Sequence, residues 1–134
     1  MTQFAFVDTG AWFAAVVPWD ANHASAAAWF EHNDRPLITT DYIVDETLTL
    51  LRSRGEGQRA ITLGERFFGG HVATIHLLTS VEIEAAWEVF RRFRDKDWSF
   101  TDCTSKVVAE ELSCAVAVAF DEHFRQFGTT LVEP

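Results

Sequence analysis

Hydrophobic and polar residues alternate along this chain in two patterns, one typical of strands and one typical of helices. Short apolar runs bounded by turn residues predict strands, at residues 4–7, 37–39, 72–77, 115–119 and 130–132. Apolar residues spaced three or four positions apart predict helices, at residues 10–17, 22–32, 41–52, 60–68, 79–93, 102–112 and 122–126. Thr79 and Glu82 have the spacing of a capping box, which predicts where one of these helices begins. Strands that alternate with helices predict an α/β fold with a parallel sheet covered on both faces.

Four acidic residues occupy positions that such a fold can use for chemistry. Asp8 and Asp121 each follow an apolar run of strand type, Asp102 opens a helical pattern, and Glu46 lies inside another. In open parallel sheets the ligand site lies beyond the carboxyl ends of the strands. Carboxylates that converge there repel one another unless a cation lies among them, and Mg²⁺ or Mn²⁺ with oxygen ligands is the usual solution. The pattern therefore favours metal-dependent hydrolysis of phosphodiester bonds.

Three of these acids also have a plainer structural interpretation. Asp8 and Asp121 each precede a predicted helix, so either side chain could serve as its N-cap. Asp102 stands at a predicted helix N-terminus, where the helix dipole favours an anion. Thr101 could cap that helix, and Lys106, four residues after Asp102, could form an ordinary surface ion pair with it.

Glu46 is distinguished from its neighbour Asp45 by helical geometry. At about 100° per residue, Glu46 falls inside the broad apolar face of its helix, whereas Asp45 falls outside it. A carboxylate on a buried face needs a partner. That partner is either a metal ion or the guanidinium of an arginine.

Composition sets limits on the class of protein. The 134 residues suit one domain spanning 1–134. The net charge of −9 argues against a simple nucleic-acid-binding module, and less strongly against a nuclease whose metal site contributes several of those charges. Two groups of basic residues could still hold phosphates, or form solvated helix surfaces: Arg91, Arg92, Arg94 and Lys96 in one group, and Arg52, Arg54 and Arg59 in the other.

Cysteine and histidine usage narrows the chemistry further. Cys103 and Cys114 do not suggest a disulfide scaffold, and the five histidines are scattered without an HExxH motif, so a zinc site is not expected. No signal peptide is visible, and the longest apolar run, 114–120, is far shorter than a membrane span. A cytoplasmic location is the resulting expectation.

Two other classes of protein share parts of the pattern. The stretch Asp8-Thr9-Gly10-Ala11 has the look of the Asp-Thr-Gly-Ala element of dimeric aspartic proteases, but those enzymes are almost wholly β. Phosphate-accepting receiver domains are α/β, but they need paired acids after the first strand and a lysine after a late strand. Neither is present, since Lys106 lies in a predicted helix.

Across essentially its whole length the chain resembles the PIN domain family, and especially the toxin ribonucleases of bacterial VapBC toxin–antitoxin pairs. The stretches that carry the resemblance are Phe-Val-Asp-Thr at 6–9, residues 40–51 around Glu46, Trp-Ser-Phe-Thr-Asp-Cys at 98–103, and Phe-Asp-Glu-His-Phe at 120–124 followed by Gly128. The Ser-Phe-Thr-Asp-Cys stretch is the most specific of them.

The resemblance implies a three-layer α/β/α sandwich and an endoribonuclease that depends on Mg²⁺ or Mn²⁺. It assigns catalysis and metal binding to Asp8, Glu46, Asp102 and Asp121, with Thr101 as a supporting hydroxyl. Toxin members imply an antitoxin protein that covers the site, and commonly a homodimer. A PIN-like protein that binds RNA or a partner without cleaving is the alternative. We expect the partner to bind apolar surface on the first two helices, around Trp12, Phe13, Trp29 and Phe30.

Overall fold

The computed structural model describes residues 3–128 and 130–134, which pack around one five-stranded sheet. All neighbouring strands are parallel, and their order across the sheet is β3-β2-β1-β4-β5. The strands are β1 (Ala5–Val7), β2 (Leu37–Thr40), β3 (Thr74–His76), β4 (Val116–Val118) and β5 (Leu131–Glu133). The predicted α/β fold with a parallel sheet is therefore confirmed, and so is the last short strand.

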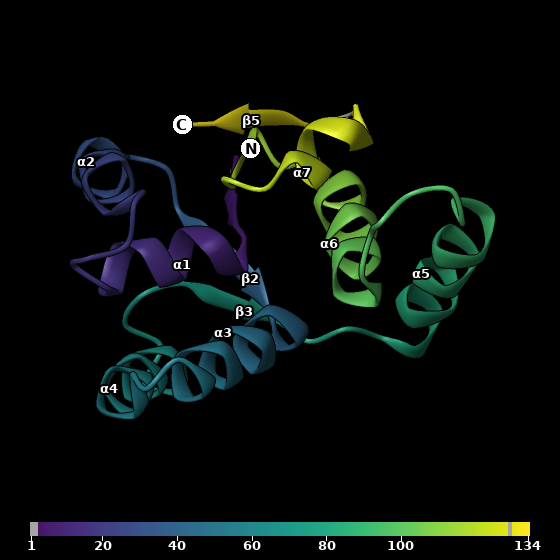
Figure 1. Ribbon diagram of the computed structural model, residues 1–134. Helices are drawn as coiled ribbons and strands as arrows, with labels where there is room; N and C mark the ends of the chain where they lie inside the picture. Colours follow the sequence, from purple (N-terminus) through teal and green to yellow (C-terminus); the bar gives the residue numbers. More distant parts are fainter. Residues whose placement is uncertain (1–2, 129) are drawn as a thin grey trace.

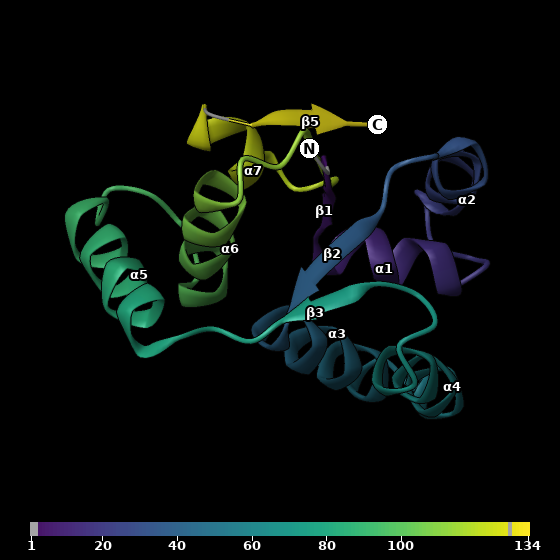
Figure 2. The ribbon, with the colours of Figure 1, turned by 180° about the vertical axis from the view of Figure 1, so that it is seen from behind.

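Helices cover both faces of this sheet. Figure 1 shows α1 to α4 gathered on one side and α5 to α7 on the other, and Figure 2 shows the same layers from behind. The helices are α1 (Thr9–Val16), α2 (His23–His32), α3 (Asp41–Ser53), α4 (Gly57–Phe68), α5 (Ser80–Arg92), α6 (Phe100–Glu111) and α7 (Glu122–Phe127). This arrangement is the expected three-layer sandwich.

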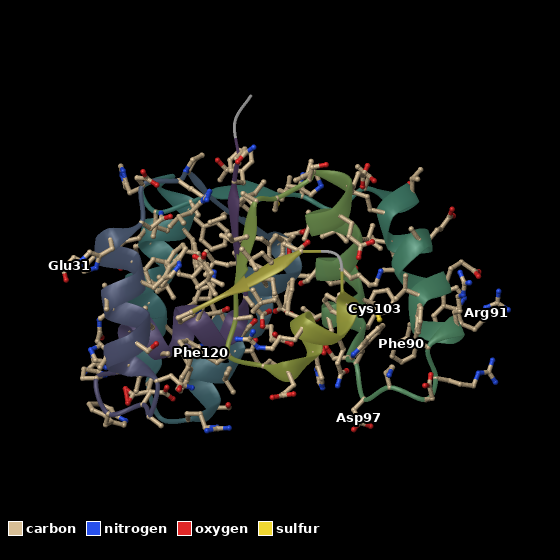
Figure 3. All side chains as sticks on the ribbon, turned by 90° about the horizontal axis from the view of Figure 1, so that it is seen from above. Glu31, Phe90, Arg91, Asp97, Cys103 and Phe120 are labelled. Atoms are coloured by element: carbon tan, nitrogen blue, oxygen red, sulfur yellow. The ribbon has the colours of Figure 1, made fainter. Side chains whose placement is uncertain are left out.

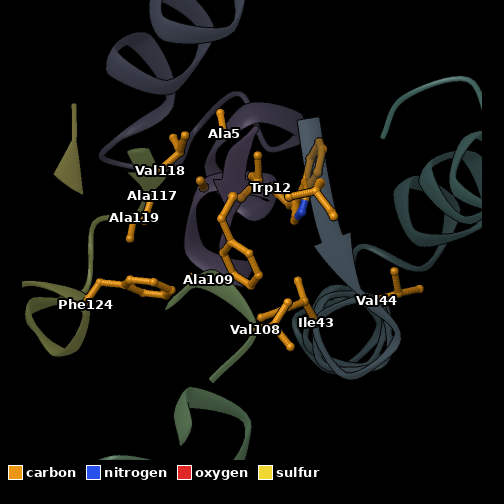
Figure 4. Packing of buried hydrophobic residues seen from close by; sticks show 14 of the residues in the cluster. Ala5, Trp12, Ile43, Val44, Val108, Ala109, Ala117, Val118, Ala119 and Phe124 are labelled. Carbon is orange, nitrogen blue, oxygen red and sulfur yellow. The ribbon is translucent and has the colours of Figure 1, made fainter. Parts of the chain in front are cut away.

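The central strands explain why the fold forms. Every residue of β1 and β4 is buried, as expected for a strand with helices on both faces. Figure 4 shows side chains from these strands meeting others from α1, α3, α6 and α7, including Trp12, Ile43, Val108 and Phe124. Burial of a large apolar side chain contributes about 1.5–3 kcal/mol, so this continuous core is the main source of stability.

Several element boundaries differ by one residue from the sequence prediction, and three elements differ by more: β3, α6, and α4, which begins at Gly57 and not at residue 60. The strand expected over residues 72–77 is shorter, Thr74–His76, and it lies at an edge of the sheet, where fewer of its residues are buried. The helix expected from residue 102 begins two residues earlier, at Phe100, because Ser99 is its N-cap. By contrast, the capping box predicted at the start of α5 is confirmed, with Thr79 and Glu82 hydrogen-bonded in both directions.

The prediction of exposed apolar surface on the first two helices fails for Trp12, and binding of a partner at this surface stays a prediction. Trp12 is only 2% exposed, and Phe13, Trp29 and Phe30 are partly buried against the core. Aromatic contacts between α1 and α2, such as the stacked rings of Trp12 and Phe30, explain this burial. The large apolar side chains that the described surface does expose lie elsewhere: Trp19, Ile61, Phe68, Leu77, Val81, Trp87, Phe90 and Leu131.

Two further expectations concern cysteines and membranes. Cys103 and Cys114 are both free and buried, which agrees with the absence of a disulfide scaffold. None of the helices that the structure describes combines the length and apolarity needed to cross a membrane.

Candidate active site

The candidate site lies where the order of the strands reverses. The chain builds β1, β2 and β3 outward in one direction and then returns to place β4 on the other side of β1. Ligands of open α/β sheets bind at such a switch point, beyond the carboxyl ends of the strands. Asp8 follows β1 and Asp121 follows β4, and the backbone N–H of Asp8 donates to the carbonyl of Val118 at 3.0 Å. The topology thus brings together two acids that are 113 residues apart.

Asp8 is the most deeply buried of the four acids, with 5% of its surface exposed. Burial is the largest influence on its carboxyl group, and the negative charges of Asp102, Glu46 and Asp121 add to it, so its pKa is raised to about 8. Asp8 occupies the N-cap position of α1, but its side chain makes no capping hydrogen bond. Capping therefore does not explain this carboxylate.

Glu46 approaches the site from α3, and its partner is a hydroxyl group. Thr9, the residue after Asp8, donates a hydrogen bond from its side chain to Oε1 of Glu46. Burial and the charges of Asp102, Asp121 and Asp45 raise the pKa of Glu46, while the Thr9 hydrogen bond opposes that rise. No arginine among the described residues forms a salt bridge with Glu46, so the arginine alternative receives no support.

Asp102 is held at the start of α6. Its Oδ2 accepts hydrogen bonds from the backbone N–H of Ser99 at 3.0 Å and from Nδ1 of His123 at 2.7 Å. Ser99 in turn caps the backbone N–H of Asp102, which completes a second capping box.

Two expectations about Asp102 are wrong. Thr101 lies inside α6 and is not its cap, and Lys106 pairs with Glu110 at 2.7 Å instead of with Asp102. The helix starts earlier than expected, which moves Thr101 into its first turn. Glu110 lies four residues after Lys106, the same spacing as Asp102 before it, and Lys106 pairs with Glu110.

Asp121 caps α7, as its position suggested. Its Oδ1 accepts a hydrogen bond from the backbone N–H of His123 at 2.7 Å, and Nδ1 of the same residue lies 3.2 Å from that oxygen. The side chain of Asp121 is 45% exposed, whereas that of Asp102 is 13% exposed. The structural role and a functional role are compatible, because capping engages one oxygen and leaves the other.

A common pattern links Glu46, Asp102 and Asp121. In each side chain the hydrogen bonds found among the described residues engage a single oxygen: Oε1 of Glu46, Oδ2 of Asp102 and Oδ1 of Asp121. The second oxygen of each is left for another ligand. Donors that fix one side of a metal-binding carboxylate in this way orient its other side.

The chemistry of these donors fits a divalent cation of the Mg²⁺ type. Hard oxygen ligands suit Mg²⁺ and Mn²⁺, and the raised pKa of Asp8 marks a place where positive charge would relieve repulsion. The arrangement is not a finished ligand cage, since no group of three or more His, Cys, Asp or Glu side chains in the described ranges is placed to hold an ion as it stands. The side chains would therefore have to adjust around a cation.

Basic and aromatic side chains gather around the loop between α5 and α6. A cavity of about 320 Å³ is lined there by Phe90, Phe93, Arg94, Lys96, Asp97, Trp98 and Cys103. Its lining includes Cys103, the residue after Asp102 in α6, but none of the four acids. A larger cavity, of about 490 Å³, lies around α4 and includes Arg59 and Arg66, and its lining also contains none of the four acids.

Comparison with known proteins identifies the family. The PIN domain model matches residues 5–129. This chain belongs to the PIN domain family. A protein named 23S rRNA-specific endonuclease VapC20, from Mycobacterium tuberculosis, is 31% identical over 129 residues, which are 96% of this chain and 98% of that protein. A VapC ribonuclease from Archaeoglobus fulgidus is 36% identical over 126 residues, 90% of this chain and 78% of the relative.

Solved structures of PIN domains agree with this assignment. The crystal structure of M. tuberculosis VapC20, described as a Sarcin-Ricin loop cleaving toxin, superimposes with a TM-score of 0.90 at 30% identity and covers 97% of this chain and 99% of its own. The structure of FitAcB from Neisseria gonorrhoeae is 14% identical with a TM-score of 0.67, which shows the fold alone. The chain is thus a VapC-type PIN domain, as the sequence resemblance indicated.

Thr9, Ser99 and His123 contact the four acids, and sequence reasoning assigned none of the three a role. Ser99 and Asp102 carry the same spacing that marked Thr79 and Glu82 as a capping box, so this signal was available. His123 follows Asp121 by two residues, but nothing local indicates that its ring reaches Asp102. Thr9 and Glu46 are 37 residues apart, and only the packing of α1 against α3 joins them.

Proposed function

We propose that this chain, as a single domain spanning residues 1–134, is a Mg²⁺- or Mn²⁺-dependent endoribonuclease and the toxin of a type II toxin–antitoxin pair that acts in the cytoplasm. Asp8, Glu46, Asp102 and Asp121 would hold the metal and carry the catalysis. The observation that supports this most strongly is geometric: Asp8 and Asp121 lie at the switch point of the sheet, Thr9 beside Asp8 binds Glu46, and His123 contacts both Asp102 and Asp121. The family membership gives the reaction class.

Each side chain has a role in this proposal. Asp8 supplies a carboxylate at the floor of the site, where burial strengthens its interaction with a cation. Thr9 holds one oxygen of Glu46, while Ser99 and His123 hold one oxygen of Asp102. When bound, a divalent ion lowers the pKa of a coordinated water and stabilises charge that develops on the scissile phosphate.

Cleavage of a defined RNA tests the proposal. VapC20 is described as cleaving the Sarcin-Ricin loop, so an end-labelled oligonucleotide of that loop and a hairpin of scrambled sequence are the first substrates to compare. We expect endonucleolytic products with Mn²⁺ or Mg²⁺ and none with excess EDTA. Binding of RNA with no cleavage at any metal concentration would favour the non-cleaving alternative.

Growth effects test the proposed partner. We expect expression of the chain alone to slow bacterial growth, and co-expression of the antitoxin encoded beside it to restore growth. The exposed apolar side chains of the surface, such as Trp87 and Phe90, give an antitoxin or a second copy of the chain area to bury. If the wild-type chain and its Asp8→Asn variant slow growth equally, catalysis is not the cause of toxicity.

The basic loop between α5 and α6 is the proposed path of the RNA backbone. Arg94 and Lys96 are exposed, line the same cavity as Cys103, the residue after Asp102, and are absent from the salt bridges of the described residues. We expect the double variant Arg94→Ala/Lys96→Ala to raise KM by roughly 3–10-fold with little change in kcat, because phosphate contacts made equally in ground and transition states alter KM alone. Steady-state kinetics at two salt concentrations measures this.

A matched control is available on the outer face of α5. Figure 3 shows Arg91 on the flank opposite Glu31, and Arg91 pairs with Glu88 at 2.7 Å. Arg91→Ala should leave KM unchanged. An equal rise in KM for Arg91→Ala and the double variant would mean that overall charge, and not this loop, governs RNA binding.

A further inference from the structure

His123 connects two of the proposed metal-binding carboxylates. Its ring Nδ1 lies 2.7 Å from Oδ2 of Asp102, and its backbone N–H donates to Oδ1 of Asp121 at 2.7 Å. Asp102 lies in α6 and Asp121 lies in the loop after β4. His123 therefore links two separate parts of the site. Its side chain is 24% exposed, which places the ring at the rim of the acidic cluster.

The hydrogen bond to Asp102 determines which ring nitrogen carries a proton. An ionised carboxylate can only accept hydrogen bonds, so Nδ1 must be a donor toward it. A histidine constrained in this way orients the carboxylate that it contacts, as outer-sphere donors commonly do in metal sites. The backbone N–H of Ser99 donates to the same oxygen, which leaves Oδ1 of Asp102 unengaged by the described residues.

We infer that His123 is a positioning residue, whose ring N–H sets the orientation of Asp102 while its backbone N–H holds Asp121, so that each carboxylate keeps one oxygen free for the cation. This inference rests on the proposed metal-dependent function. It does not make His123 a ligand of the metal or a group that reacts with RNA. Its effect on catalysis passes through the affinity of the site for the cation.

Two substitutions separate hydrogen bonding from packing. His123→Asn keeps a donor at the place of Nδ1 and removes the ring, whereas His123→Phe keeps a planar ring and removes the donor. Both leave the backbone N–H to Asp121 in place. His32→Asn, at the exposed end of α2, is a control for the loss of an imidazole far from the site.

The measurement is the Mn²⁺ concentration at which the rise in melting temperature is half complete, which needs no substrate. We expect His123→Phe to raise this concentration by about 10-fold or more, the usual range for loss of an outer-sphere donor, and His123→Asn to stay within about threefold of wild type. RNA cleavage by His123→Phe should then recover at high Mn²⁺, so that its apparent metal requirement changes more than its maximal rate.

The opposite order, with His123→Phe close to wild type and His123→Asn impaired, would show that the ring acts only by packing and would overturn the inference. An unchanged midpoint in both variants would overturn it too, while leaving the proposed function intact if wild-type protein still responds to Mn²⁺. If wild-type protein does not respond to Mn²⁺, the proposed metal site fails and this inference fails with it.

Discussion

Asp8→Asn and Asp102→Asn are each expected to reduce RNA cleavage by about 100-fold or more while the fold survives. Asparagine keeps the shape of the side chain and one acceptor oxygen, but it removes the negative charge that attracts a hard cation. Losses of about this size are usual for groups that act on a transition state. Single-turnover cleavage of a labelled RNA measures the loss, and circular dichroism shows whether the fold is retained.

Asp45, which neighbours Glu46 in the sequence, provides the matched control for these variants. Asp45 is exposed on α3, next to Glu46 but outside the apolar face. Asp45→Asn makes the same chemical change one residue from Glu46. We expect cleavage by this variant within about twofold of wild type. Full activity in both Asp8→Asn and Asp102→Asn would remove these carboxylates from the mechanism. Equal losses in all three variants would point to net charge as the cause.

Much of the fold was predictable because its signals are local. A buried parallel strand is apolar on both faces, so β1 and β4 stand out as short continuous apolar runs. The predicted strand over residues 72–77 was too long because an edge strand is only partly buried, which weakens the boundary signal in the sequence. The predicted start of α6 is two residues late because the N-cap is Ser99, which forms a capping box with Asp102, and not Thr101.

The candidate site was predictable only in part, because its contacts are not local. Asp8 and Asp121 end strands, and this pattern indicates that both lie at one edge of the sheet. The sequence does not show that β4 returns to lie beside β1, and this return is what brings the two acids together. Nor does it show that the ring of His123 crosses to Asp102, 21 residues earlier. The aromatic residues of the first two helices are less exposed than expected for a related reason: α2 packs against α1, so Trp12 is buried and Phe13, Trp29 and Phe30 are partly buried.

The acidic site carries a cost in stability that depends on pH. In the unfolded chain Asp8 ionises near its ordinary pKa of 3.8, whereas in the fold its pKa is raised to about 8, first by burial and then by the charges of Asp102, Glu46 and Asp121. Between these two values the unfolded state releases a proton that the folded state keeps. The stability of the metal-free protein should therefore be highest below about pH 4 with respect to this group, and it should fall as pH rises toward 8.

Asp8→Asn is accordingly expected to be more stable than wild type at pH 8 in EDTA, by roughly 5 °C or more in melting temperature, because it removes the buried charge. It should also flatten the decline between pH 5 and 8. Saturating Mn²⁺ should reverse the order: wild type gains about 2.7 kcal/mol at roughly a hundred times the dissociation constant, and the variant gains little. Thermal melts with EDTA and with Mn²⁺, and Asp45→Asn as the control for general charge, measure both effects. An Asp8→Asn variant that is less stable than wild type at pH 8 without metal would show that Asp8 supports the fold directly, and the proposed opposition between stability and metal binding at this site would have to be abandoned.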